Sequence, residues 1–181
     1  MAFNIINKLK HLIKEPKLDS NGFMIYAPIS GEVIPITDVP DVVFSEKIAG
    51  DGVAIKPTSS TIVAPVDGVV THIFETNHCL VVTADNGIEV LIHFGIDTVE
   101  LQGKGFTRVA EKGQQVKVGA PLIELDLEFL ESNAKSTITP IVISNIEVKK
   151  DGKSQFGYYE GSAVAGVTQI MSIGIGEKSE S

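Results

Sequence analysis

The chain has 181 residues, of which 43% are hydrophobic and 21% are charged. This apolar content is sufficient for one domain with its own core, and it excludes global disorder. The formal net charge of -8 at pH 7 argues against nucleic acid as the main partner, because phosphate binding requires a basic surface.

Residues 2–14 are predicted to form a short amphipathic helix that ends before Pro16. The lysines lie on the polar half of the helical wheel, and the apolar half consists of Phe3, Ile5, Ile6, Leu9, Leu12 and Ile13. The apolar half can pack on the main domain or anchor the chain weakly to an anionic membrane. Both interpretations stay open, and residues 1–19 are treated as an N-terminal amphipathic basic tail.

From Ile25 onward, short runs rich in valine and isoleucine alternate with glycine, proline, aspartate and asparagine. Strands are therefore expected at Glu32–Ile36, Gly52–Lys56, Thr61–Val63, Gly68–Phe74, Leu80–Thr83, Ile88–Phe94, Gln115–Val118, Leu122–Leu125 and Ile141–Ile143. Many short strands separated by turns predict an all-β sandwich or barrel. The segment Leu127–Lys135 has helix-forming residues and is expected to be a short helix.

The C-terminal part has a less regular pattern. Glu147–Glu160 is polar and is interpreted as an exposed loop or a poor helix, and Ser162–Ile173 as a last strand or pair of strands. The chain is accordingly divided into the basic tail, a main domain at 20–175, and a C-terminal tail at 176–181 that is expected to be disordered.

Two strand-like runs flank Asn86-Gly87, which is a strong signal for a β-hairpin. A two-residue turn places His93 opposite Leu80, with His78 diagonal to it on the same face, and a four-residue loop places the two histidines directly opposite each other. A three-residue loop places them on opposite faces of the sheet. Two of these three geometries bring the imidazoles together.

A pair of neutral imidazoles suits phosphoryl transfer near pH 7, because imidazole is nucleophilic and forms a labile N–P bond. One ring nitrogen of His93 must be free to attack, and Gly95 lets the backbone come close to the ring and orient it. His78 can donate a hydrogen bond to a phosphoryl oxygen, and the hydroxyl of Thr76 can orient its ring.

Other interpretations of the two histidines stay open at this point. They can be ordinary, partly buried side chains, or two ligands of a zinc site for which Asp41 and Asp97 are the available carboxylates. The sequence has no HExxH motif, no Cys/His cluster and no phosphate-binding loop. It therefore gives no indication of a zincin or of direct use of ATP.

Cys79 is the single cysteine, and it is interpreted as a small core residue without a catalytic role. One cysteine excludes an intramolecular disulfide and is typical of a reducing cytosol. No apolar run is long enough to span a bilayer, and no secretory signal pattern is present. The protein is therefore expected to be cytoplasmic.

Seven blocks of the sequence form a recognisable set: Ala27–Glu32, Val39–Lys47, Gly50–Pro57, Val63–Gly68, Ile73–His78, His93–Leu101 and Lys135–Pro140. Together they resemble the glucose-specific enzyme IIA component of the bacterial phosphoenolpyruvate-dependent sugar phosphotransferase system. The resemblance covers roughly residues 22–173, and matching blocks of this length are far more specific than a short motif.

The resemblance implies an antiparallel β-sandwich with short helical segments. It implies that His93 is phosphorylated at the ring nitrogen far from the main chain, that His78 stabilises the phosphoryl group, and that Thr76 orients His78. The donor would be the phosphohistidine of the small carrier HPr, and the acceptor a cysteine of glucose-type enzyme IIB. The protein would therefore be a phosphotransferase component that relays a phosphoryl group.

The resemblance also implies a docking surface around the site. Asp41 and Asp97 match acidic residues at its rim, which would meet basic surfaces of the partners. Phe44, Phe74 and Val99 match parts of an apolar docking patch, and such an exposed patch is a binding feature.

Members of this family in enteric-type bacteria also regulate carbon uptake, so glycerol kinase, sugar permeases and adenylate cyclase are further expected partners. No cofactor is obligatory. Zinc is expected only at a partner interface, where His78 and His93 would share it with a partner carboxylate. The tail at residues 2–14 resembles a membrane-binding helix of the family, which implies a weak peripheral contact with the inner membrane.

Two rival hypotheses stand beside the phosphocarrier. A zinc-dependent hydrolase on a related β scaffold would need a third internal zinc ligand, and a purely regulatory binding protein would have lost phosphoryl transfer. The segment Asn145–Gly161 departs from the family pattern, because it is longer and poorer in helix formers than the usual last helix.

Overall fold

The computed structural model describes residues 22–146 and 156–174. The predicted helix at 2–14 and the predicted tail at 176–181 lie outside these residues, as do the outer limits of the predicted domain at 20–175. No helix of the described part is long and apolar enough to cross a membrane.

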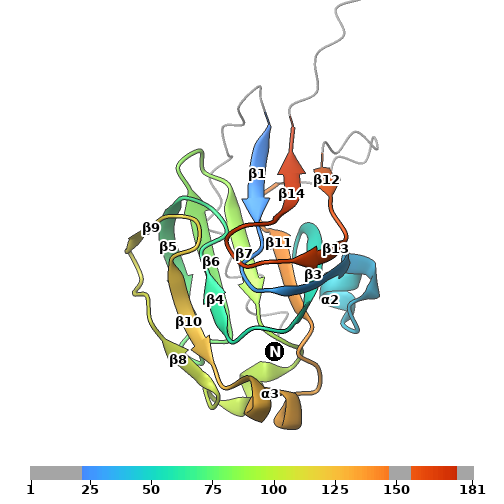
Figure 1. The fold of residues 1–181 in the computed structure, drawn as a ribbon, viewed down its shortest axis with the longest axis vertical. Coiled ribbons are helices and arrows are strands. Elements are labelled where there is room, and N and C mark those ends of the chain that lie inside the picture. The colour runs from blue at the N-terminus through green and yellow to red at the C-terminus, as the bar shows by residue number, and fades with distance from the viewer. Residues whose placement is uncertain (1–21, 147–155, 175–181) are drawn as a thin grey trace, which may run out of the picture.

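The described residues form an antiparallel β-sandwich built from three sheets (Figure 1). The eight-stranded sheet has the order β13-β2-β3-β11-β7-β6-β5-β9, and its strands are Gly161–Ala163, Gly31–Pro35, Asp51–Pro57, Thr139–Ile143, Glu89–His93, Cys79–Ala84, Gly68–Ile73 and Gln115–Val116 in that order. One three-stranded sheet is β4-β10-β8 (Thr61–Val63, Pro121–Leu125, Phe106–Arg108), and the other is β1-β14-β12 (Phe23–Tyr26, Gln169–Ile173, Phe156–Tyr158).

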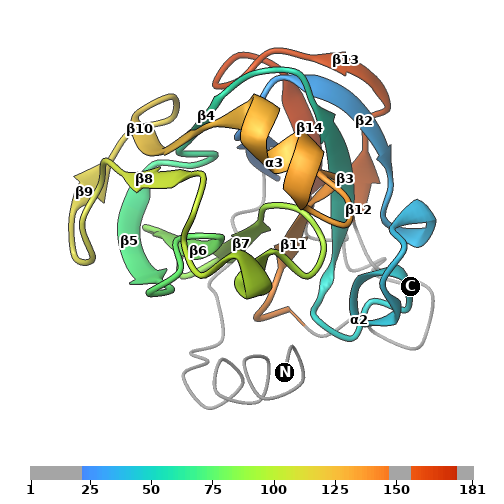
Figure 2. The ribbon, with the colours of Figure 1, turned by 90° about the horizontal axis from the view of Figure 1, so that it is seen from below.

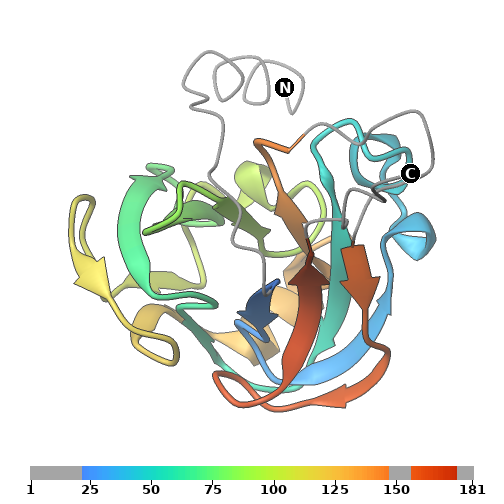
Figure 3. The same cartoon turned by 90° about the horizontal axis from the view of Figure 1, so that it is seen from above.

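The described residues also form short helical segments. They are α2 at Val42–Ser45, α3 at Leu127–Asn133, and two 3-10 turns at Ile36–Asp38 and Thr98–Leu101. The helix α3 lies at one end of the sandwich, opposite the end at which β1, β14 and β12 run side by side (Figure 1, Figure 2 and Figure 3).

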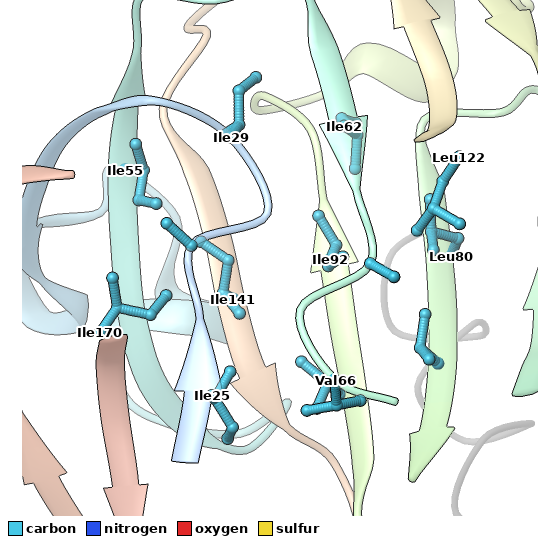
Figure 4. Packing of buried hydrophobic residues seen from close by; sticks show 14 of the residues in the cluster. Ile25, Ile29, Ile55, Ile62, Val66, Leu80, Ile92, Leu122, Ile141 and Ile170 are labelled. Carbon is cyan, nitrogen blue, oxygen red and sulfur yellow. The ribbon is translucent and has the colours of Figure 1, made fainter. Parts of the chain in front are cut away.

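The central strands β6 and β7 are buried on both faces. On one face Leu80 and Ile92 point into the main core between the sheets (Figure 4). On the other face Val81 and Leu91 pack in a second cluster together with Phe44 of α2. Because burial of each such side chain stabilises the fold by roughly 1.5–3 kcal/mol, this pair of strands is a rigid base for whatever lies at its ends.

The predicted strands are present within a residue or two of their expected limits, and α3 confirms the predicted helix at Leu127–Lys135. The predicted last pair of strands is β13 and β14. The loop or poor helix predicted for Glu147–Glu160 is wrong for Phe156–Tyr158, which form β12, and residues 147–155 lie outside the described part. The strands β1 and β8 and the helix α2 were not expected from the sequence.

A polar contact between distant segments ties β12 to the large sheet. Tyr158 donates a hydrogen bond of 2.5 Å to Asp51, which also pairs with Lys47 at 3.2 Å. Asp51 is only 1% exposed, so both contacts compensate for the burial of its carboxylate. Burial and the Asp51 carboxylate raise the pKa of Tyr158, and its hydroxyl therefore remains a donor.

Candidate active site

His93 is the last residue of β7, and the backbone that follows turns back to hold its ring. Nδ1 of His93 donates a hydrogen bond of 2.8 Å to the carbonyl oxygen of Gly95. A carbonyl oxygen can only accept, so Nδ1 carries the proton and Nε2 of the neutral ring has the lone pair. Nε2 is therefore the ring nitrogen whose lone pair is available for attack.

The turn at Gly95 requires glycine. Its φ is +71°, and an added Cβ would lie 2.6 Å from both the carbonyl oxygen of Ser136 and Cγ2 of Thr98. The same turn is fixed by a bond from Ile96 N–H to Ser136 at 2.9 Å and by one from the Thr98 hydroxyl to the Phe94 carbonyl at 2.5 Å. These contacts hold the acceptor for Nδ1 in place.

His78 lies in the turn that joins β5 to β6, one residue before β6 begins. Its carbonyl oxygen accepts from Phe94 N–H at 2.7 Å, which ties this turn to the end of β7. Its Nδ1 lies 2.6 Å from Oγ1 of Thr76, the residue expected to orient this ring. Asn77 between them has a φ of +57°, a left-handed conformation that asparagine tolerates better than most residues.

The structure brings the two imidazoles together, with ring centroids 5.0 Å apart and ring planes at 82°. The two registers that predicted this contact are nevertheless wrong, because His93 pairs with Cys79. That is the three-residue-loop register, which was expected to place the histidines on opposite faces. His78 escapes this alternation because it precedes the strand and the left-handed Asn77 redirects the chain.

Burial keeps His78 neutral. His78 is only 1% exposed, and its Nε2 has no hydrogen-bond partner among the described residues. Burial, followed by the proximity of His93, lowers the pKa of His78 to about 3. With Nδ1 accepting from the Thr76 hydroxyl, Nε2–H is a donor that a phosphoryl oxygen could satisfy.

His93 is half-buried and is also held neutral near pH 7. Burial lowers its pKa, while its contact with the Gly95 carbonyl and the charges of Asp41 and Asp97 act in the opposite direction. The neutral form is the one that can attack phosphorus. The two acidic residues therefore favour a positive charge on this ring.

The predicted docking residues lie at different depths. Phe44 packs on His93 with centroids 5.1 Å apart but is only 4% exposed, so it lies beneath the surface. Phe74 is half-buried and contacts His78 at 5.8 Å, and Val99 is half-buried as well. Val42, beside Phe44 on α2 and 55% exposed, is an apolar surface residue that the sequence did not single out.

The two predicted acidic residues have different local roles. Asp41 begins α2, where its side chain accepts from Val43 N–H at 2.8 Å. Asp97 is exposed and pairs with Lys135 at 3.5 Å. Both carboxylates keep a contact within the chain while their charges act on His93.

The described residues give no support to an internal zinc site. No group of three His, Cys, Asp or Glu side chains in residues 22–146 and 156–174 could hold a metal ion. Cys79 is buried and free, and burial raises the pKa of its thiol. It is therefore an unreactive core residue.

The family described as "phosphoenolpyruvate-dependent sugar phosphotransferase system, EIIA 1" matches residues 23–148. The chain belongs to this family. It is 61% identical over 134 residues to the glucose-specific EIIA component of Haemophilus influenzae, which covers 71% of this chain and 81% of that protein. It is 51% identical over 150 residues to the same component of Buchnera aphidicola subsp. Acyrthosiphon pisum, which covers 82% of this chain and 90% of that protein.

A solved structure agrees with these relatives. The glucose permease IIA from Mycoplasma capricolum superposes with a TM-score of 0.76 at 31% identity, covering 83% of this chain and 95% of that one. The enzyme IIA assignment makes this protein a phosphotransferase component of the sugar phosphotransferase system, and it implies HPr and an enzyme IIB as partners. The strands β12 to β14 lie beyond the residues that the family matches.

Proposed function

We propose that this enzyme IIA accepts a phosphoryl group from phospho-HPr on Nε2 of His93 and passes it to a cysteine of glucose-type enzyme IIB. The observation that carries this proposal is the 2.8 Å bond from Nδ1 of His93 to the Gly95 carbonyl. It assigns the proton to Nδ1 and leaves Nε2 as the nucleophile before the phosphoryl group arrives.

The transfer would proceed in two balanced steps. In the first, the lone pair of His93 Nε2 forms an N–P bond while the N–P bond in phospho-HPr breaks and the HPr imidazole leaves. In the second, a cysteine thiolate of enzyme IIB forms an S–P bond, and His93 leaves as the neutral imidazole. The charge of the transferring group needs stabilisation in both steps, and the unpartnered Nε2 of His78 is the donor we assign to it.

Thr76 supports this donor role. A hydroxyl that donates to Nδ1 of His78, 2.6 Å away, fixes the tautomer with its proton on Nε2. Because burial keeps His78 neutral, the ring donates one hydrogen bond without adding a positive charge that would trap the phosphoryl group.

We assign docking to the surface around the two rings. Asp41 and Asp97 would meet basic partner surfaces, while Phe74 and Val99 supply its apolar part. Phe44 acts from below, where it supports the His93 ring. Mixed surfaces of this kind combine electrostatic steering with a small apolar contact area, which suits short-lived complexes.

We also infer a regulatory role from family membership. Glycerol kinase, sugar permeases and adenylate cyclase are the partners we assign to it, in a cytoplasmic protein with a weak contact to the inner membrane through residues 2–14. Any zinc would be bound at such an interface by His78, His93 and a partner carboxylate, since zinc requires at least three protein ligands. Binding of glycerol kinase with and without a chelator tests this.

Labelling with phosphoenolpyruvate, enzyme I and HPr tests the phosphocarrier proposal. The wild-type chain should take up one acid-labile phosphoryl group, and His93→Gln should take up none. His78→Gln should still accept phosphate but pass it poorly to enzyme IIB, because the donor to the transferring group is lost. Persistent labelling of His93→Gln would refute the assignment of the nucleophile, and labelling without transfer to any enzyme IIB would favour the purely regulatory alternative.

A further inference from the structure

Arg108 is the only arginine among the 15 lysines and arginines of the chain, and it ends β8 in the small sheet. Its guanidinium group reaches the turn that carries His78. Nε donates to Oδ1 of Asn77 at 2.8 Å, and Nη2 donates to the carbonyl oxygen of Phe74 at 3.1 Å. Arg108 thereby contacts the chain on both sides of Thr76, the residue that holds the His78 ring.

We propose that Arg108 is a positioning residue for phosphoryl transfer, which fixes this turn and, through Thr76, the ring of His78. The inference rests on the proposed function, because it assigns to Arg108 the task of holding the donor for the transferring group. Arg108 acts through the turn and touches neither imidazole in the contacts described above.

The turn needs such a contact. Its left-handed residue Asn77 has a φ of +57°, a conformation that is strained for residues other than glycine, although asparagine tolerates it better than most. The Phe74 carbonyl accepts two bonds, one from Asn77 N–H at 2.8 Å and one from Arg108. The two bonds from Arg108 therefore tie both ends of the turn to β8, a strand of a different sheet.

The His78 ring packs against the rings of Phe74 and His93, but within the described part of the chain a single hydrogen bond holds it. Its Nε2 has no partner among the described residues, and only Nδ1 is bound, to Thr76. The hydrogen bond that orients the ring, and with it Nε2, thus depends on where the turn places Thr76. A misplacement of about 1 Å can reduce a reaction rate by roughly 100-fold, so a loosened turn would be visible in transfer.

An arginine is better suited to this task than a lysine. The planar guanidinium presents several N–H donors in a fixed fork, so one side chain can bind a side-chain oxygen and a backbone carbonyl at the same time. A lysine offers a single mobile ammonium group. The fork of donors is therefore the property that the turn uses.

The test compares Arg108→Met, Arg108→Lys and Asn77→Gly with the wild type. Asn77→Gly removes the acceptor side chain but keeps a residue that adopts positive φ easily, and Lys112→Met, which removes an exposed cation, is the control. We expect Arg108→Met and Arg108→Lys to slow transfer from the phosphorylated protein to enzyme IIB about 10-fold and to shift the ring signals of His78 in ¹⁵N NMR spectra. Asn77→Gly should give part of both effects, and the control neither.

A double-mutant comparison separates positioning from general stability. If Arg108 acts through His78, Arg108→Met should add no further loss of transfer in a His78→Gln protein. Any of three results would overturn the inference. They are a full additional loss of transfer in the double variant, wild-type transfer by Arg108→Met, and transfer restored to the wild-type rate by Arg108→Lys. Failure of the wild type itself to accept phosphate would instead refute the proposed function, and the NMR signals of His78 would still test the contact.

Discussion

The low pKa of His78 predicts a specific dependence of stability on pH. Burial lowers this pKa from 6.5 to about 3, so the imidazole is neutral in the folded chain at any pH above that value. The unfolded chain binds the proton once the pH falls below about 6.5. Protonation then favours the unfolded state, and the free energy of unfolding must fall as the pH decreases from 6.5 toward 3.

The size of the effect follows from the two pKa values. Between pH 7 and pH 5, His78 should reduce the free energy of unfolding by about 2 kcal/mol. The assay is urea unfolding of the wild type and of His78→Gln at pH 7, 6 and 5. Glutamine does not titrate, so the wild type should lose about 2 kcal/mol more than the variant over this range. Parallel pH profiles for the two proteins would refute the burial argument.

Two further substitutions test contacts around the site and behind it. Tyr158→Phe removes the hydroxyl that donates to the buried Asp51 at 2.5 Å; chemical unfolding should show a loss of about 1–3 kcal/mol, with phosphate acceptance unchanged. An unaltered unfolding midpoint would contradict that role. Gly95→Ala places a Cβ 2.6 Å from the carbonyl oxygen of Ser136 and from Cγ2 of Thr98. The variant should therefore lose about 1–3 kcal/mol of stability. It should also accept phosphate from phospho-HPr more slowly. Wild-type acceptance by this variant would contradict the assigned role of the turn.

The strands were predictable because their valine and isoleucine runs are separated by strong turn residues. The interior of β6 and β7 illustrates this: Leu80–Thr83 and Ile88–Phe94 were expected, and Cys79–Ala84 and Glu89–His93 are observed. Burial on both faces makes such runs continuously apolar. The fold class therefore follows from local pattern alone.

The hairpin register was not predictable in the same way. Asn86-Gly87 is compatible with loops of different lengths, and the observed pairing of His93 with Cys79 was the least favourable of the three for the site. The contact between the imidazoles instead depends on Asn77, whose positive φ ends the alternation just before β6. Strand periodicity says nothing about a residue outside the ladder.

Other features depend on contacts that are distant in the sequence. The helix α2 contains four residues, too few for a helical period, and the side chain of Asp41 begins it. The strand β12 lies in a polar segment and is held through Tyr158 on Asp51. The bonds of Arg108 span 31 and 34 residues. None of these pairs has a local sequence signal.

The position of the phosphoryl group is the most direct test of the site. The protein, labelled with ¹⁵N in its histidine rings, would be phosphorylated with phosphoenolpyruvate, enzyme I and HPr and then studied by NMR spectroscopy. We predict one phosphohistidine, at His93 and substituted at Nε2, with Nδ1 still protonated against the Gly95 carbonyl and His78 unmodified. A phosphoryl group on Nδ1 of His93, or on His78, would contradict the proposed transfer.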